Sequence, residues 1–204
     1  MSKKTGYTAT STHLDFGCGG NPRNPLQAME LITVDVQIHS KQVPTHRIAP
    51  GAKLPFDNET FDSISAYDVL EHLSREAPNN LFIYYMNELH RVLRPGGTAV
   101  FVFPAFPHRD AFSDPTHVNF ITSDTVNYFT NNLPRNTQPY EGILTNYSVV
   151  KNSRLRKWKR WVYDSQVYDI PSEKNLRRRV SLWKRTLFRA IFPQHRIWIL
   201  IKNF

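Results

Sequence analysis

Three glycines and an acidic residue near the start of the chain have types and spacing that could hold a nucleotide. Gly17, Gly19 and Gly20 form a turn directly after an apolar segment, and Asp35 ends the next apolar segment. Glycine lets the backbone turn sharply and approach a ligand closely, because it lacks a Cβ atom. A carboxylate at the end of the second strand can accept hydrogen bonds from a ribose diol. The pattern predicts a nucleotide-binding unit over residues 12–35.

The turn departs from the glycine pattern of dinucleotide-binding folds. The pattern G-x-G-x-x-G, counted from Gly17, requires a third glycine where this chain has Pro22, so NAD is disfavoured. Asp15, two residues before the first glycine, indicates instead a ligand with a positive amino group beside the turn. Cys18 lies inside the turn without an evident partner base, so we interpret it as a small space-filling residue rather than a nucleophile.

The elements that must position these residues are apolar strands and one amphipathic helix. Leu81, Tyr85, Leu89 and Val92 recur at helical spacing and predict a helix over about residues 77–93. The Arg-Pro-Gly-Gly segment that follows should end this helix. Further strands are predicted at 43–48, 61–68, 98–103, 142–150 and 195–202, and short helices near Pro25 and after an N-cap at Ser123.

Several motifs, taken in chain order, resemble those of the class I S-adenosylmethionine-dependent methyltransferases over about residues 12–130. The D-x-G-x-G-G turn and the distal acid resemble motifs I and II of that family. The other segments that carry the resemblance are Leu54-Pro55-Phe56, Phe61-Asp62, Val69-Leu70-Glu71-His72-Leu73 and Glu88 to Gly97. The resemblance implies a Rossmann-like α/β fold, with a seven-stranded, mostly parallel sheet, an antiparallel last strand and helices on both faces.

The resemblance also implies a cofactor, S-adenosyl-L-methionine, and the residues that hold it. The glycine turn would hold the methionine part and Asp35 the ribose. The family often has an acid after its third strand that contacts the adenine, but residues 47–51 contain none, so backbone groups or apolar side chains must recognise it. The predicted cofactor-binding residues are Asp15, Gly17, Cys18, Gly19, Gly20, Asp35, Leu54 and Asp68.

Candidate catalytic residues lie after the fourth strand and in a long loop over residues 104–120. Methyl transfer is an in-line displacement, so the enzyme aligns the reactants and supplies a base where the acceptor is a hydroxyl. The loop resembles, in its Asp-Pro-Thr-His segment, methyltransferases of glycan and cell-surface biosynthesis. His117 is the predicted base, because imidazole titrates near neutral pH, and His72 and Asp114 are the other candidates. The alternative is that His117 and Asp114 only cap the loop.

A metal site is a second use for some of the same residues. Asp68-x-x-Glu71-His72 resembles the Glu-x-x-Glu-His metal motif of small-RNA 3′-terminal 2′-O-methyltransferases and of some quinone-pathway O-methyltransferases. With His117 from the later loop, the candidate ligands are two carboxylates and two imidazoles, which could hold a divalent ion and lower the pKa of an acceptor hydroxyl. Asp68 is one methylene shorter than the first Glu of the motif. The alternative is that Glu71 and His72 cap the following helix.

Composition suits one compact domain over residues 1–204, since 40% of the residues are hydrophobic and 21% are charged, and the resemblance implies that this is a single methyltransferase domain. One cysteine excludes an internal disulfide. No apolar run of about 18 residues and no apolar leader occur, so we expect a cytoplasmic protein. The net charge of +9 is uneven, because residues 1–150 carry −3 and residues 151–204 carry +12.

The positive charge marks a predicted basic helical insertion over residues 151–193, before the last strand. Its apolar residues share one helical face and its arginines occupy the remainder. Such a helix could lie on an anionic membrane surface, at the inner face, or cover the edge of the sheet with its arginines in water. Cations alternate with tryptophans over residues 154–161, which suits nucleic acid, although no specific RNA-binding motif occurs.

Together these features favour a methyltransferase that O-methylates a small molecule or a glycan or lipid-linked acceptor. Two alternatives remain open. The first is a nucleic-acid 2′-O-methyltransferase, and the second is a catalytically silent protein of the same fold that acts as a binding subunit.

Overall fold

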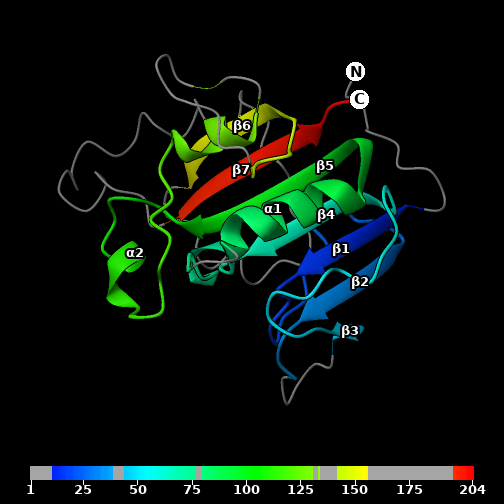
Figure 1. Ribbon diagram of the computed structural model, residues 1–204, viewed down its shortest axis with the longest axis horizontal. Helices are drawn as coiled ribbons and strands as arrows, with labels where there is room; N and C mark the ends of the chain where they lie inside the picture. Colours follow the sequence, from blue (N-terminus) through cyan, green and yellow to red (C-terminus); the bar gives the residue numbers. More distant parts are fainter. Residues whose placement is uncertain (1–10, 39–43, 77–79, 131–132, 134–141, 156–194) are drawn as a thin grey trace, which may run out of the picture.

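The computed structural model describes residues 11–38, 44–76, 80–130, 133, 142–155 and 195–204. Seven strands form one sheet in the order β3-β2-β1-β4-β5-β7-β6 (Figure 1). Strand β7 runs antiparallel to both of its neighbours, and the other pairs are parallel. The fold class is therefore confirmed. The strands are β1 Thr12–Phe16, β2 Glu30–Asp35, β3 His46–Arg47, β4 Phe61–Tyr67, β5 Leu93–Pro104, β6 Tyr147–Leu155 and β7 His195–Lys202.

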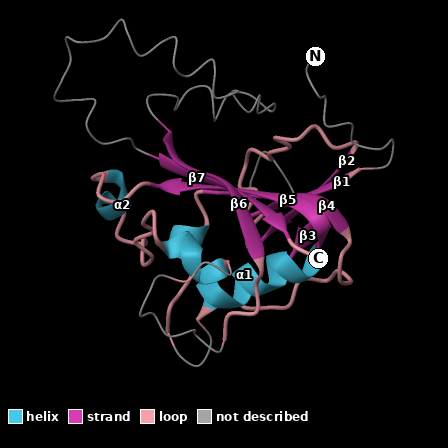
Figure 2. Ribbon diagram, turned by 90° about the horizontal axis from the view of Figure 1, so that it is seen from above, coloured by secondary structure: helices cyan, strands magenta, loops and turns pink. Residues whose placement is uncertain are grey.

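Helix α1 (Leu81–Val92) lies against one face of the sheet (Figure 2). It begins at Asn80, whose side chain accepts a hydrogen bond from the backbone N–H of Ile83, so the helix starts later than predicted. The helix buries Phe82, Tyr85, Met86, Leu89 and Val92 against the sheet. It ends at Leu93, which is already extended and pairs with Phe61, so the Arg-Pro-Gly-Gly segment belongs to β5.

Irregular chain replaces the helix predicted near Pro25. The side chain of Asn24 accepts a hydrogen bond from the backbone N–H of Ala28 and donates one to its carbonyl, at 2.9 and 2.8 Å. These bonds satisfy backbone groups that a helix would use, so the segment stays a loop. Leu26 of this loop packs on the sheet face opposite α1. Helices were predicted on both faces; in the described residues α1 covers one of them.

Two other elements differ from their predicted bounds. The helix expected after an N-cap at Ser123 is a 3-10 helix over Thr125–Phe129, preceded by Asp124 without a side-chain cap. Strand β6 begins at Tyr147 and includes Lys151–Leu155, the first residues of the predicted basic insertion. The remainder of that insertion, residues 156–193, lies outside the described residues. In the part of the chain that the structure describes, no helix has the length and apolar character needed to span a membrane.

Glu88 and Arg91 on α1 hold the Leu-Pro-Phe loop. Arg91 forms two charge-assisted hydrogen bonds with the Glu88 carboxylate, at 2.7 and 2.8 Å, and donates to the carbonyls of Leu54 and Phe56. Glu88 in turn accepts a hydrogen bond from the backbone N–H of Leu54. A bidentate pair of this kind fixes orientation as well as contributing energy. Two motifs that are 34 residues apart in the chain are therefore one structural unit.

A buried polar chain lies on the face of the sheet opposite α1. The ring nitrogens of His13 bond to the hydroxyls of Ser63 and Ser65, at 2.7 and 2.8 Å, and Ser65 donates to Asp15 at 2.7 Å. All four side chains are buried. Burial lowers the pKa of His13 to about 3 and raises the pKa of Asp15 to about 7. His13 therefore stays neutral in the folded protein through the physiological range.

We expect His13→Gln to lose stability at pH 8 by about 1–3 kcal/mol, because one of two buried hydrogen bonds is lost. Unfolded His13 binds a proton below pH 6.5, whereas folded His13 stays neutral to about pH 3, so its contribution is complete above pH 6.5 and declines as the pH falls. The difference between variant and wild type should shrink by about 1.4 kcal/mol per pH unit below 6.5. Urea unfolding at pH 8, 6.5 and 5 measures it.

The contribution of Asp15 to stability changes with pH in the opposite direction to that of His13. The pKa of Asp15 is raised in the folded protein, so its stabilising effect declines as the pH rises toward 7. Taking the difference between variant and wild type at each pH removes this contribution. A difference that does not change with pH would show that His13 is not a buried neutral imidazole.

Candidate active site

The glycine turn follows β1 and contacts the end of β2, where the backbone N–H of Gly17 donates to the carbonyl of Val34 at 2.8 Å. Two of its glycines are required for different reasons. Gly17, at φ +70°, has no room for a side chain, because an added Cβ would lie 2.5 Å from Val69 Cγ2. Gly19 has φ +55°, but an added Cβ there meets no atom within 4 Å. Gly17 therefore serves packing against the segment after β4, whereas Gly19 borders open space where a ligand would fit.

Asp15 and Asp35 both contact the turn. Asp35 accepts hydrogen bonds from the backbone N–H groups of Gly19 and Gln37, at 2.8 and 2.9 Å. Asp15 is buried and accepts from the Ser65 hydroxyl and from the backbone N–H of Arg23, both at 2.7 Å. The structure thus brings the two acids to the same turn. Each carboxylate oxygen has a second lone pair that could accept from a ligand. The contact of Asp35 with a ribose and that of Asp15 with an amino group stay predictions.

Three more of the predicted cofactor residues are placed as follows. Cys18 is buried, and desolvation together with Asp15 and Asp35 raises the pKa of its thiol to about 11, which suits a filler rather than a nucleophile. Gly20 is exposed at the turn. Leu54 is buried in the core beside α1. A role for these residues in holding the cofactor stays a prediction.

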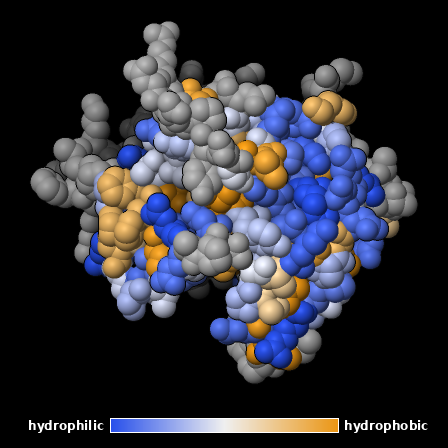
Figure 3. Space-filling model, in the orientation of Figure 1, coloured by the Kyte–Doolittle hydropathy of each residue, from blue (hydrophilic) through white to orange (hydrophobic). Residues whose placement is uncertain are grey.

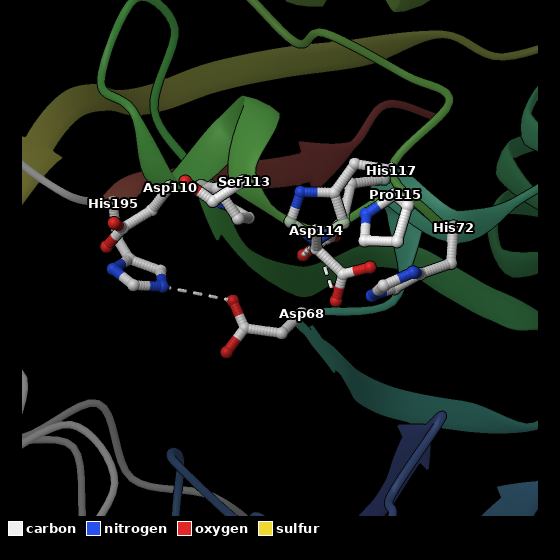
Figure 4. A pocket seen from close by; sticks show the side chains of 10 residues that line it. Asp68, His72, Asp110, Ser113, Asp114, Pro115, His117 and His195 are labelled. Atoms are coloured by element: carbon white, nitrogen blue, oxygen red, sulfur yellow. Dashed lines mark ion pairs between the residues drawn. The ribbon is translucent and has the colours of Figure 1, made fainter.

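A pocket of about 560 Å³ opens where β4 and β5 end (Figure 4). It contains five of the residues proposed for catalysis or metal binding, from two separate parts of the chain. The lining residues are Asp68, Glu71, His72, Pro104, Asp110, Ser113, Asp114, Pro115, His117 and His195. The predicted assembly of the fourth-strand end with the later loop is therefore present.

His195 is a pocket residue that the sequence analysis missed. Its Nε2 atom lies 3.1 Å from Asp68 Oδ1, and the two side chains face each other in Figure 4. Strand β7 runs antiparallel to β5, and its first residue pairs with Pro104, the last residue of β5. An antiparallel last strand must begin at the edge where the parallel strands end. This rule, applied to the predicted strand over 195–202, could have located His195.

The segment after β4 and the later loop are held together through Asn119. Its side-chain amide donates to the carbonyls of Leu70 and Leu73, at 2.9 and 2.6 Å. The backbone N–H groups of Val118 and Asn119 both donate to the carbonyl of Glu71, at 2.9 and 3.0 Å. Leu70–His72 is a single 3-10 turn. These bonds place Glu71 and His72 beside His117.

Asp114 and Thr116 orient His72. Asp114 Oδ1 accepts from the backbone N–H of Thr116 at 2.8 Å and from its hydroxyl at 2.6 Å. These bonds lower the pKa of the Asp114 carboxyl. The Thr116 oxygen lies 2.9 Å from His72 Nδ1. Asp114 Oδ1 thus caps this turn, while its Oδ2 atom lies 3.9 Å from His117 Nε2 in the pocket.

The ionisable groups in the pocket interact strongly. Burial, reinforced by the nearby carboxylates of Asp68 and Asp114, raises the pKa of Glu71 well above its ordinary value. Burial and the neighbouring His117 lower the pKa of His72. The rings of His72 and His117 meet edge to face, with centroids 4.7 Å apart. The lowered pKa favours the neutral form of His72 in the pocket.

Comparisons with known proteins agree with this geometry. Residues 14–101 match the family model described as a methyltransferase domain. A S-adenosylmethionine-dependent methyltransferase of Archaeoglobus fulgidus has a similar structure, with a TM-score of 0.59, 16% identity, and coverage of 95% of this chain and 87% of that one. Among the curated proteins, no similar sequence was found.

Two further structures share the fold. The YcgJ protein of Bacillus subtilis gives a TM-score of 0.53 at 18% identity, covering 96% of this chain and 93% of its own. A chain from the complex between the Haloferax volcanii Trm112 methyltransferase activator and its proposed methyltransferase gives a TM-score of 0.55 at 12% identity. The match covers 96% of this chain and 84% of that one. At these identities the likeness concerns the fold alone.

Proposed function

We propose, from the premise that this chain is a S-adenosylmethionine-dependent methyltransferase, that it methylates a hydroxyl group of a small molecule, glycan or lipid-linked acceptor bound in the pocket of Figure 4. The cofactor supplies a methyl group made electrophilic by a sulfonium. The residues of this chain bind and orient the acceptor and take up its proton.

The observation that carries the proposal is the place of His117 in the wall of the pocket, with one ring nitrogen bonded to the backbone. Its Nδ1 atom lies 3.2 Å from the carbonyl oxygen of Ala111, which can only accept, so Nδ1 carries the proton. In the neutral ring the lone pair is then on Nε2, which lies 4.0 Å from Glu71 and 3.9 Å from Asp114. A neutral imidazole held in this way can activate a hydroxyl at neutral pH.

The residues around the glycine turn fit the cofactor. Space is open at Gly19, and Asp35 contacts the backbone of that residue, so a ribose there would meet a carboxylate with lone pairs remaining. Asp68 lines the pocket, and it follows β4, which pairs with β1 of the turn. Its carboxylate would favour a positively charged donor at this edge of the sheet.

The pocket and its surroundings support an acceptor of moderate size with an apolar part. A volume of about 560 Å³ suits a small-molecule site. Figure 3 shows apolar side chains gathered at the end of the molecule that holds α2 (Asp110–Ser113). The exposed apolar residues of this loop are Phe106, Phe112, Val118 and Phe120, and the rings of Phe112 and Phe120 stack. Such a surface suits the apolar portion of a lipid-linked acceptor.

The uneven distribution of charge along the chain supports the proposal that the protein acts near an anionic membrane surface on the cytoplasmic side. Residues 151–204 carry a net charge of +12. Basic residues attract anionic lipid head groups, and this attraction would concentrate the enzyme where lipid-linked acceptors are found.

A labelling assay tests the acceptor class. Tag-free protein is incubated with S-adenosylmethionine carrying a radioactive methyl group and with separate lipid, soluble-metabolite and RNA fractions. We expect base-stable label in a lipid or soluble hydroxyl compound. Label only in RNA would replace the proposal by a nucleic-acid methyltransferase. Tight cofactor binding without label in any fraction would favour a binding subunit.

A further inference from the structure

We propose that His195 is a positioning residue, which holds the Asp68 carboxylate toward the positively charged sulfur of the methyl donor. This contact would make the protein bind S-adenosylmethionine more tightly, relative to the uncharged product S-adenosylhomocysteine, than it would without the contact. The inference rests on the proposed place of the cofactor at the glycine turn. It does not depend on the identity of the acceptor.

Asp68 lies where the glycine turn and the acceptor pocket meet. Its side chain lines the pocket. The next residue, Val69, packs against Gly17 of the turn. Transfer between a donor at the turn and an acceptor in the pocket requires the reacting atoms to be roughly 3–3.5 Å apart. The sulfonium must therefore lie close to the border of the two sites, and Asp68 is placed to face its charge.

The other carboxylates of the pocket are less suited to this contact. Burial raises the pKa of Glu71 well above its ordinary value, which opposes its negatively charged form. Asp110 and Asp114 belong to the loop after β5 rather than to the segment that packs against the turn. Asp68 is thus the carboxylate of the pocket that adjoins the cofactor side.

The backbone of Asp68 is fixed in an unusual conformation. Its φ angle is +51°, in the left-handed region that few residues other than glycine adopt. Its backbone N–H donates to the carbonyl of Val102 on β5, at 2.8 Å. Residues with side chains persist in this region where their surroundings hold them there, and they cluster at ligand sites.

His195 holds the side chain of Asp68 from the last strand. Its Nε2 atom lies 3.1 Å from Asp68 Oδ1 (Figure 4). His195 is itself fixed, because it pairs with Pro104 at the start of β7 and its side chain is only 10% exposed. The Asp68 side chain is 29% exposed, so a ligand can reach it. A carboxylate offers about four lone-pair positions on its two oxygens, so it can contact an imidazole and a cationic ligand together.

A carboxylate held at this place would also assist release of the product. Methyl transfer breaks the sulfur–methyl bond, leaves the electron pair on the sulfur and passes the acceptor proton to the base. The sulfur changes from a sulfonium to a neutral thioether, so its attraction to Asp68 ends with the reaction. The pair of Asp68 and His195 therefore selects the donor over the product by charge.

Calorimetric titration of tag-free protein with each of the two ligands measures this selection as the ratio of their dissociation constants. Asp68→Asn keeps the shape of the side chain and tolerates a positive φ, and it should lower the preference for S-adenosylmethionine about tenfold. His195→Asn, whose amide is too short to reach Asp68, should lower the preference about three- to tenfold. His195→Gln places an amide N–H near the position of Nε2 and should stay within about twofold of wild type.

Two controls separate positioning from packing and from the general charge of the pocket. Asp110→Asn removes another carboxylate of the pocket and should leave the preference within about twofold of wild type. The double variant Asp68→Asn, His195→Asn should lose no more than Asp68→Asn alone, because His195 acts through that carboxylate. A packing defect would instead weaken the binding of both ligands equally.

An unchanged or increased preference in Asp68→Asn or His195→Asn, with the protein folded by circular dichroism, would overturn the inference. Equal losses in His195→Asn and His195→Gln would overturn it as well. The titrations need no acceptor, so the two proposals fail separately. Methyl label found only in RNA would remove the proposed function and leave the selection by charge intact.

Discussion

Valine in place of Gly19 is expected to lower the affinity for S-adenosylmethionine at least about 100-fold, equivalent to about 2.7 kcal/mol, while the domain stays folded. An added Cβ meets no protein atom within 4 Å, so the branched side chain would occupy space that the cofactor needs. The backbone also has φ +55°, which adds strain of about 1–3 kcal/mol for a residue with a side chain. Calorimetric titration with S-adenosylmethionine measures the loss.

Gly96→Val provides the matched control. Gly96 has φ +75°, and an added Cβ there is 3.8 Å from the ring of Phe204, so the variant carries similar backbone strain far from the turn. It should bind the cofactor with wild-type affinity. Gly17→Val should instead fail to fold normally, because Val69 occupies the space. Unchanged affinity in a folded Gly19→Val protein would place the cofactor elsewhere.

Replacing His117 by glutamine is expected to reduce kcat about 10²- to 10⁴-fold, with little effect on cofactor affinity. Glutamine can still donate to the carbonyl of Ala111, but it offers no basic nitrogen to the pocket. A loss of this size is typical when the group that activates a hydroxyl is removed. Initial rates with the acceptor identified by labelling, at saturating cofactor, measure it.

His108→Gln is the control for this substitution. His108 lies in the same loop and accepts a hydrogen bond from the backbone N–H of Asp110, but it does not line the pocket. Its replacement should leave kcat within about twofold of wild type, since glutamine can still accept from the backbone N–H of Asp110 and His108 presents no group to the pocket. Equal losses in the two variants would indicate a general disturbance of the loop.

The sequence predicted the fold and the two halves of the site, because both depend on short-range patterns. The glycine turn, the helical spacing of Leu81 to Val92 and the order of the motifs predicted the sheet, with Asp35 at the end of β2 and Asp68 directly after β4. The prediction of a helix near Pro25 was wrong, because the side chain of Asn24 bonds to the backbone N–H and carbonyl of Ala28 and so competes with helix formation.

The contacts of the pocket could be predicted only in part. From the sequence, His117 was predicted to be the base, with a capping role for His117 and Asp114 as the alternative. In the structure Asp114 caps the turn, whereas His117 lines the pocket. His195 was missed because its proximity to Asp68 depends on a strand that is 127 residues away in the chain. Such long-range pairs follow from topology rather than from spacing.

The bonds from Asn119 have a consequence for how new specificities could arise. Residues 105–116 leave the sheet at the end of β5 and return at a point fixed to the turn that follows β4. Substitutions of the exposed side chains of Phe106 and Phe112 can therefore reshape the surface offered to an acceptor, while the backbone carbonyl of the buried Ala111 still orients His117. Libraries of variants limited to Phe106 and Phe112 should yield altered acceptor preference at nearly constant thermal stability.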